Sequence, residues 1–294
     1  MSFSEHPQFE GQAPINTEPD KVPIATELVA SPGSSSEMAV APPAPPVENP
    51  VWNGWDVLVV AVLTFVTTLI LPFVVAWIGQ LTVYPHTGLI DSLQKHATMQ
   101  LISQTLIDAA WVMLMVVLIE GKYHIPFWSA IRWNWPKGAW KQLLLGAAML
   151  FTLSMLERVL PMPKETPFEK LFERPRDAYL LALMAVTLGP LVEELFFRGF
   201  FYPVLARRWG VGWGVFLSAL PFALMHLPQY SWSWGVVLVI LMVGVVCGVV
   251  RATTGSVGAS FLVHIGYNGT QMLIAVLWTR GFTHMPKSLL ALCG

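Results

Sequence analysis

Long runs of apolar residues fill the chain after residue 51 and constrain its fold more than any other feature. Crossing the hydrocarbon layer of a bilayer, roughly 30 Å thick, takes about 20 helical residues at about 1.5 Å per residue. Seven runs approach or exceed this length, at residues 57–79, 99–119, 142–160, 179–197, 211–227, 234–250 and 257–279. The sequence therefore predicts an all-α, polytopic membrane bundle of about seven transmembrane helices.

Tryptophans at or near the ends of these runs are typical of residues that anchor a helix at the membrane interface. They are Trp55, Trp77, Trp140, Trp213, Trp234 and Trp278. The shorter runs near 211 and 234 leave tilted, partial or re-entrant helices open. An added half-helix in 81–93 or 283–292 would also change the count of spans.

Composition agrees with a membrane protein and excludes other classes. Hydrophobic residues make up 54% of the 294 positions and charged residues only 12%, with a mean hydropathy of +0.57, whereas soluble domains are near a quarter charged. A net charge of -1 gives no electrostatic support for binding nucleic acid. The two cysteines, Cys247 and Cys293, cannot form a disulfide framework or a four-cysteine zinc site.

The first fifty residues differ from the rest of the chain. They contain ten of the 23 prolines, seven acidic residues, one lysine and no tryptophan or tyrosine. Such a segment cannot bury enough apolar surface to order itself, so we expect a disordered tail without a signal peptide. Its Pro-rich end, 41–50, favours a spacer over a ligand for an SH3-like domain. The basic connection at 122–141 favours a cytoplasmic N-terminus.

Ionisable side chains within the apolar runs are few, and each costs a few kcal/mol at membrane depth unless it has a partner or a function. They are Asp108, Glu157, Arg158, Glu193, Glu194, Arg198, His226 and His264. Asp108 lies in the middle of its run, and no other residue in the sequence explains it.

The fourth run ends with two adjacent carboxylates that we expect to differ in role. At about 100° per residue, Glu194 and Arg198 share a helix face and can pair, whereas Glu193 points elsewhere. A carboxylate without a cation in a membrane cavity is suited to act as a general base. Pro190 can kink the helix and free carbonyl groups nearby. The alternative is a frayed, wet helix end at which both acids pair with Arg198 and Arg207.

Two histidines accompany these carboxylates. His226 follows Phe222 by four residues, and His264 precedes Asn268 by four, so the last two polar groups share one face of an apolar run. An interfacial histidine and interhelical hydrogen bonding are the structural alternatives.

A carboxylate, two imidazoles and an amide can activate water and stabilise a tetrahedral oxyanion, which is the chemistry of peptide hydrolysis. The chain has no His-Glu-x-x-His zinc helix, no Gly-x-Ser-x-Gly elbow and no pair of intramembrane aspartates. A serine dyad of Ser260 and His264 is less suitable, because one helix would carry both members and Glu193 and His226 would have no role.

In order along the chain, three motifs resemble the type II CAAX prenyl protease and bacteriocin-processing (CPBP, or Abi) family of intramembrane endopeptidases. They are Glu193-Glu194-x-x-x-Arg198, Phe222-x-x-x-His226 and His264-x-x-x-Asn268, with Thr254-Gly255-Ser256 similar to the usual lead-in. The resemblance covers roughly residues 140–280. It divides the chain into a tail (1–50), two N-terminal transmembrane helices with a basic loop (51–139), a catalytic domain (140–280) and a short C-terminal segment (281–294).

The resemblance implies that Glu193 is the catalytic base and acts with His226 on the attacking water. It implies that His264 and Asn268 bind the oxyanion and that Glu194 is held by Arg198. We expect no cofactor. The alternative is a divalent metal such as zinc, bound by Glu193, His226 and His264.

Substrate and location are inferred less directly. Eukaryotic relatives remove the last three residues of prenylated proteins, and bacterial relatives are linked to peptide maturation or to self-immunity against bacteriocins. Short loops favour a prokaryotic inner-membrane protein, with the bilayer and a peptide or protein substrate as its partners. A non-catalytic immunity or scaffold protein, or a proton-coupled transporter using Glu193 and Asp108, is the alternative function.

Overall fold

The structure is a computed structural model that describes residues 48–163, 166–167, 172 and 174–284, all within the unit Ala44–Gly294. Almost all of the predicted tail (1–50) and residues 285–294 of the C-terminal segment lie outside the described residues. The described part is helical and contains no strand, which confirms the all-α prediction.

The N-terminal part of the described chain consists of two long helices and short connections. Its elements are α1 (Gly54–Thr82), α2 (Leu89–Lys95), α3 (Ala97–Val116), the π-helix η1 (Val117–Lys122) and α4 (Phe127–Ala130). Asn53 caps α1 in a reciprocal pair with Asp56. The short α2 overlaps only the end of 81–93, where an added half-helix is one of the alternatives, and it is not among the helices long enough to cross a membrane.

The C-terminal part of the described chain begins with α5 (Ala139–Glu157), which is followed by a long interrupted helix. This helix comprises α6 (Pro175–Val186), α7 (Leu188–Glu194), the π-helix η3 (Leu195–Phe201) and α8 (Tyr202–Trp209). The chain then forms α9 (Val211–Leu224), the 3₁₀ turn η4 (Leu227–Tyr230), α10 (Trp234–Thr254) and α11 (Val257–Trp278).

All seven predicted runs lie on helices. Five described helices are long and apolar enough to cross a membrane: Gly54–Thr82, Ala97–Lys122, Ala139–Glu157, Pro175–Trp209 and Trp234–Thr254. Val211–Leu224 is a shorter apolar helix. The 22-residue α11 falls outside the five because it carries His264, Asn268 and Gln271 among its apolar residues.

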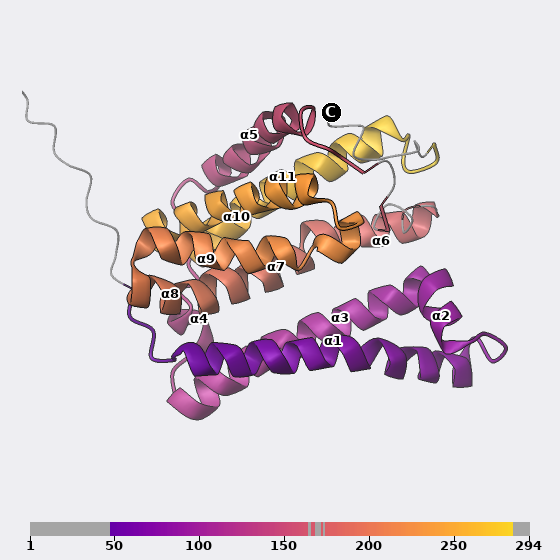
Figure 1. Cartoon of the computed structure of the whole chain (residues 1–294), viewed down its shortest axis with the longest axis horizontal. Helices are drawn as coiled ribbons and strands as arrows, with labels where there is room; N and C mark the ends of the chain where they lie inside the picture. The colour runs from indigo at the N-terminus through magenta and orange to yellow at the C-terminus, as the bar shows by residue number, and fades with distance from the viewer. Residues whose placement is uncertain (1–47, 164–165, 168–171, 173, 285–294) are drawn as a thin grey trace, which may run out of the picture. The chain divides into compact units, whose positions relative to one another are not determined.

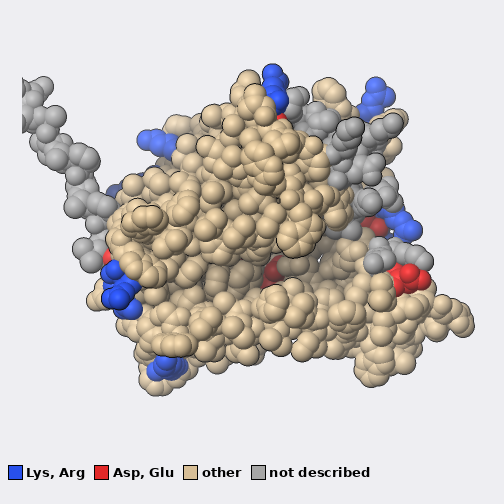
Figure 2. Space-filling view, viewed as in Figure 1, with Lys and Arg blue, Asp and Glu red and all other residues tan. Residues whose placement is uncertain are grey.

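The outer surface is apolar, as a lipid-facing surface requires. Large side chains of α1 such as Phe65, Phe73 and Trp77 are exposed, and so are the other five predicted tryptophan anchors. In Figure 2 the visible face is largely uncharged, with basic groups at its margins.

Helices of the C-terminal part approach one another closely through glycines. A Cβ atom at Gly146 of α5 would lie 2.1 Å from the Val263 carbonyl oxygen, and one at Gly266 of α11 would lie 2.3 Å from that of Leu143. Glycine is therefore required on both sides of the α5–α11 contact. Gly244 of α10 likewise packs against α9, where its Cβ would lie 3.0 Å from Ala219.

Figure 1 shows α1 and α3 side by side with the short α2 at one end of the pair, and α7, α9, α10 and α11 grouped together. The contacts of α3 with α6, α7 and η3 join these groups. Figure 2, in the same view, shows a hollow between them with acidic surface inside it.

Candidate active site

The helix that carries the two glutamates is irregular on both sides of them. It is interrupted at Thr187, which ends α6 and precedes α7. Pro190 explains this interruption, because its ring lacks an N–H donor and clashes with the carbonyl group four residues before it. After Glu194 the helix widens into the π-helix η3, which carries Arg198. Such irregular turns are frequent at functional sites.

Glu194 is fully buried, and both of its carboxylate oxygens have partners. Arg198 Nη1 forms an ion pair with Oε1 at 3.0 Å, and His264 Nδ1 lies 3.0 Å from the same oxygen. The Ser260 hydroxyl lies 2.5 Å from Oε2 and 3.0 Å from the Cys247 carbonyl oxygen. The Ser260 hydroxyl has one proton, and it donates this proton to the Glu194 carboxylate because a carboxylate is a stronger acceptor than a carbonyl group.

Arg198 is held from several directions. Its Nη2 donates to the Gly244 carbonyl oxygen at 2.7 Å, and its guanidinium lies 4.6 Å from the centre of the Phe222 ring. The Phe222 ring also contacts both imidazoles, with centroids 5.1 Å from His226 and 5.8 Å from His264. Phe222 thus packs between the ion pair and the histidines.

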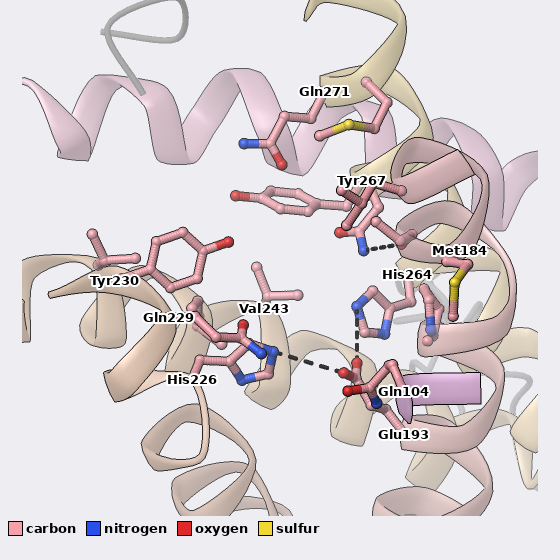
Figure 3. Close-up of a pocket in the computed structure, with 18 of the residues that line it drawn as sticks. Gln104, Met184, Glu193, His226, Gln229, Tyr230, Val243, His264, Tyr267 and Gln271 are labelled. Atoms are coloured by element: carbon pink, nitrogen blue, oxygen red, sulfur yellow. Dashed lines mark hydrogen bonds and ion pairs between the residues drawn. The ribbon is translucent and has the colours of Figure 1, made fainter. Parts of the chain in front are cut away.

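Glu193 lines the cavity, unlike the buried pair, and lies between the two histidines (Figure 3). Its Oε1 is 3.7 Å from His226 Nε2, and its Oε2 is 3.7 Å from His264 Nε2. These distances are too long for direct hydrogen bonds and short enough for a bridging water or a small shift of a side chain.

The hydrogen bonds of the histidines assign their tautomers. His226 Nδ1 lies 2.8 Å from the Phe222 carbonyl oxygen, and His264 Nδ1 contacts the Glu194 carboxylate. Since both partners only accept, each Nδ1 carries a proton and each Nε2 is turned toward Glu193. The Nε2 atoms are therefore the ones available for proton exchange.

Asn268 lines the same cavity from α11. Its Nδ2 donates to the Ala185 carbonyl oxygen at 2.8 Å, next to the interruption at Thr187. One amide proton remains, because an NH₂ group has two.

These side chains surround a cavity of about 920 Å³. Glu193, His226, His264 and Asn268 all line it, whereas Glu194, Arg198 and Ser260 are not among its lining residues. The structure therefore brings the four predicted catalytic residues to one cavity and places the predicted supporting pair behind them.

The surroundings contain residues whose roles the sequence did not indicate. Ser260 was considered only as a nucleophile, yet it is fully buried and bonded to Glu194. Its position one turn before His264 was the signal that both share a partner. Glu157 and the Asp108–Gln104 pair also line the cavity, and Arg207 donates to the carbonyl groups of Pro50 and Trp52 and not to the glutamates.

Side chains that can bind a metal ion lie close together at one place among the described residues. One group of three, Glu194, Cys247 and His264, brings possible ligand atoms within 4.8 Å of one another. Arg198 already neutralises Glu194 at this position, so a cation there would meet a guanidinium. The predicted set of Glu193, His226 and His264 does not form such a group among the described residues.

The chain thus has the architecture of an integral membrane protein: an apolar helical bundle holds carboxylate, imidazole and amide groups around an internal cavity. Residues 175–270 match the family model described as type II CAAX prenyl endopeptidase Rce1-like. The match contains all three motifs and confirms the assignment of this segment to the CPBP family. Because this is a family of proteases, the match supports peptidase activity for this chain. No curated protein and no solved structure matches the chain.

Proposed function

We propose that this protein is an intramembrane endopeptidase in which Glu193 and His226 activate a water molecule. The observation that carries the proposal is the position of Glu193 in the cavity, 3.7 Å from an imidazole nitrogen on either side. A water molecule between Glu193 and His226 has two proton acceptors and lies beside His264.

In the proposed reaction the water oxygen attacks the carbonyl carbon of the scissile bond, and its proton passes to the Glu193 carboxylate. The tetrahedral intermediate carries an oxyanion. The C–N bond then breaks, and the proton on Glu193 passes to the leaving amine. The hydroxyl of the water molecule ends on the new carboxyl group and its proton ends on the leaving amine, so the enzyme returns to its starting state.

The oxyanion is stabilised by His264 Nε2 in its protonated form and by the free amide proton of Asn268. Glu194 supports this role, because its carboxylate contacts His264 Nδ1 at 3.0 Å and so fixes the ring with Nε2 toward the cavity. Arg198 and Phe222 act as positioning residues for Glu194 and the two histidines.

We propose that the mechanism needs no metal. The donors considered for zinc, Glu193, His226 and His264, do not come together as a three-ligand group within the described residues. Metal analysis of the purified protein tests this, and stoichiometric zinc that is needed for cleavage would contradict it.

The location is part of the proposal. We propose a prokaryotic inner membrane, a cytoplasmic N-terminus and a catalytic domain at 140–280, which contains the matched segment 175–270. The Lys and Arg content of the 122–141 connection supports this orientation. Cysteine labelling of the two ends of α1 in intact cells measures it.

Replacing Glu193 with Gln tests the proposed activity. We expect peptide cleavage by the purified protein to fall by at least about a hundredfold, the lower range for loss of a general base, with unchanged thermal unfolding. The matched control is Glu120→Gln. Glu120 is exposed, and its Oε1 accepts a bond from the Phe127 amide, which a glutamine can also accept.

The alternative is a non-catalytic membrane partner or a proton-coupled transporter. It predicts that the cellular phenotype survives Glu193→Gln, or that pH-dependent flux appears in vesicles without cleavage. Cleavage that persists in Glu193→Gln at the level of the control also contradicts the endopeptidase proposal.

A further inference from the structure

The cavity is acidic. Asp108 from α3, Glu157 from the end of α5 and Glu193 from α7 line it, and its described lining residues include no lysine or arginine. The nearby Arg198 is buried and bound to Glu194 and Gly244. In Figure 2 acidic surface is visible inside the hollow, while the basic groups lie at the margins. The three carboxylates therefore make this cavity a place where a cation can bind.

Asp108 is the acid of this lining that has a fully buried oxygen atom without a hydrogen-bond partner. It is only 3% exposed, and Gln104 Nε2 donates to its Oδ1 at 2.8 Å. Its Oδ2 is buried without a hydrogen-bond partner. A half-bonded carboxylate at membrane depth is costly and needs a partner, which a ligand in the cavity can supply.

The neighbours of Asp108 do not supply the missing charge. The charged group that acts on Asp108 is Glu193, and the two carboxylates repel each other. Gln104 fixes Oδ1 and so orients the carboxylate. The site offers one carboxylate and one amide, which suits an ammonium or guanidinium group better than a metal ion, which prefers several oxygen ligands.

From this geometry we infer that the cavity binds a basic side chain or free amine of a peptide, and that Asp108 binds its cationic group beside the bond held at Glu193. This inference rests on the proposed endopeptidase function for the identity of the ligand as substrate.

Binding to a cleavage-deficient protein tests the inference apart from catalysis. The probes are two fluorescent nonapeptides of alanine and leucine, acetylated and amidated, with a central lysine in one and norleucine in the other. Anisotropy is measured with full-length Glu193→Gln protein in neutral detergent. We expect the lysine peptide to bind about tenfold more tightly, because truncating one side of a desolvated charge pair has at least this effect.

Asp108→Asn in the same background keeps the shape and an acceptor oxygen but removes the charge. We expect the two peptides to bind it equally, through weaker binding of the lysine peptide alone. The matched control is Asp91→Asn, which removes an exposed carboxylate of α2 and should keep the tenfold preference. Glu157→Gln should reduce the preference by less than Asp108→Asn does.

Equal binding of the two peptides to Glu193→Gln protein overturns the inference. A preference that survives in Asp108→Asn also overturns it and assigns Asp108 to a neutral hydrogen bond. Failure of the proposed function appears differently, as absence of cleavage by the wild-type protein while the charge preference in binding remains.

Discussion

The carboxylates on the buried side of the site and those on its cavity side differ in how completely they are bonded. On the buried side, Glu194 has partners for both oxygens in Arg198, His264 and Ser260, and it is fully shielded from solvent. On the cavity side, Glu193 has only the two long contacts with imidazoles at 3.7 Å, and Asp108 has one bonded oxygen. Two adjacent residues of one helix thus have different surroundings.

This difference separates positioning from chemistry. A buried carboxylate with partners on both oxygens has one arrangement, and any change of its protonation costs those partners as well. A carboxylate with loose contacts in a cavity can gain and lose a proton while its neighbours stay in place. The comparison predicts that substitutions on the buried side change stability, whereas those on the cavity side change activity or binding.

The largest effect on stability is expected for Arg198→Met. It leaves the Glu194 carboxylate buried without its cation, which costs about 3–5 kcal/mol in the free energy of unfolding. Thermal unfolding in detergent should show a large decrease in midpoint, where Glu193→Gln shows little change.

Arg207→Met is the matched control for this prediction. Arg207 is exposed and donates to the backbone carbonyl groups of Pro50 and Trp52, so its removal leaves no buried charge without a partner. Equal destabilisation by the two arginine substitutions would show that Glu194 does not depend on the charge of Arg198.

Ser260→Ala is expected to have an intermediate effect. It removes the donor at 2.5 Å from Glu194 Oε2 and leaves that buried oxygen unsatisfied, at a cost of about 1–3 kcal/mol. Unfolding of Ser218→Ala provides the comparison, since that buried hydroxyl donates only to the Val215 carbonyl oxygen. A smaller loss in Ser260→Ala than in Ser218→Ala contradicts a special role of the bond to Glu194.

The helices and the polar faces were predictable from the sequence because each depends on local periodicity. Apolar runs of sufficient length located all seven segments. The spacing of Glu194 and Arg198 indicated their pairing, which depends only on residues one turn apart. The motif Thr254-Gly255-Ser256 has a local explanation in the structure: Gly255 ends α10 with a φ of 65°, and Ser256 caps α11.

Other features depend on contacts between distant segments and left no such pattern. The π-helix after Glu194 and the close α5–α11 contact depend on packing across the bundle. Asp108 had no explanation in the sequence because Gln104, one turn before it, is uncharged, and the carboxylate that acts on it, Glu193, is 85 positions away. Several predictions stay untested, including the roles of the site residues, the absence of a metal and the N-terminal tail.

The smallest effect is expected for Ser256→Ala at the start of α11. The Ser256 hydroxyl accepts from the Ala259 amide at 3.0 Å and donates to the Asn134 carbonyl oxygen at 2.6 Å. Loss of a helix N-cap costs about 1 kcal/mol, less than loss of the bond to Glu194 one turn further along the same helix. Thr253→Ala, which removes an exposed hydroxyl, should change unfolding by less still. A larger destabilisation by Ser256→Ala than by Ser260→Ala would contradict this order. It would show that the cap at the start of α11 stabilises the helix more than the bond to the buried Glu194 does.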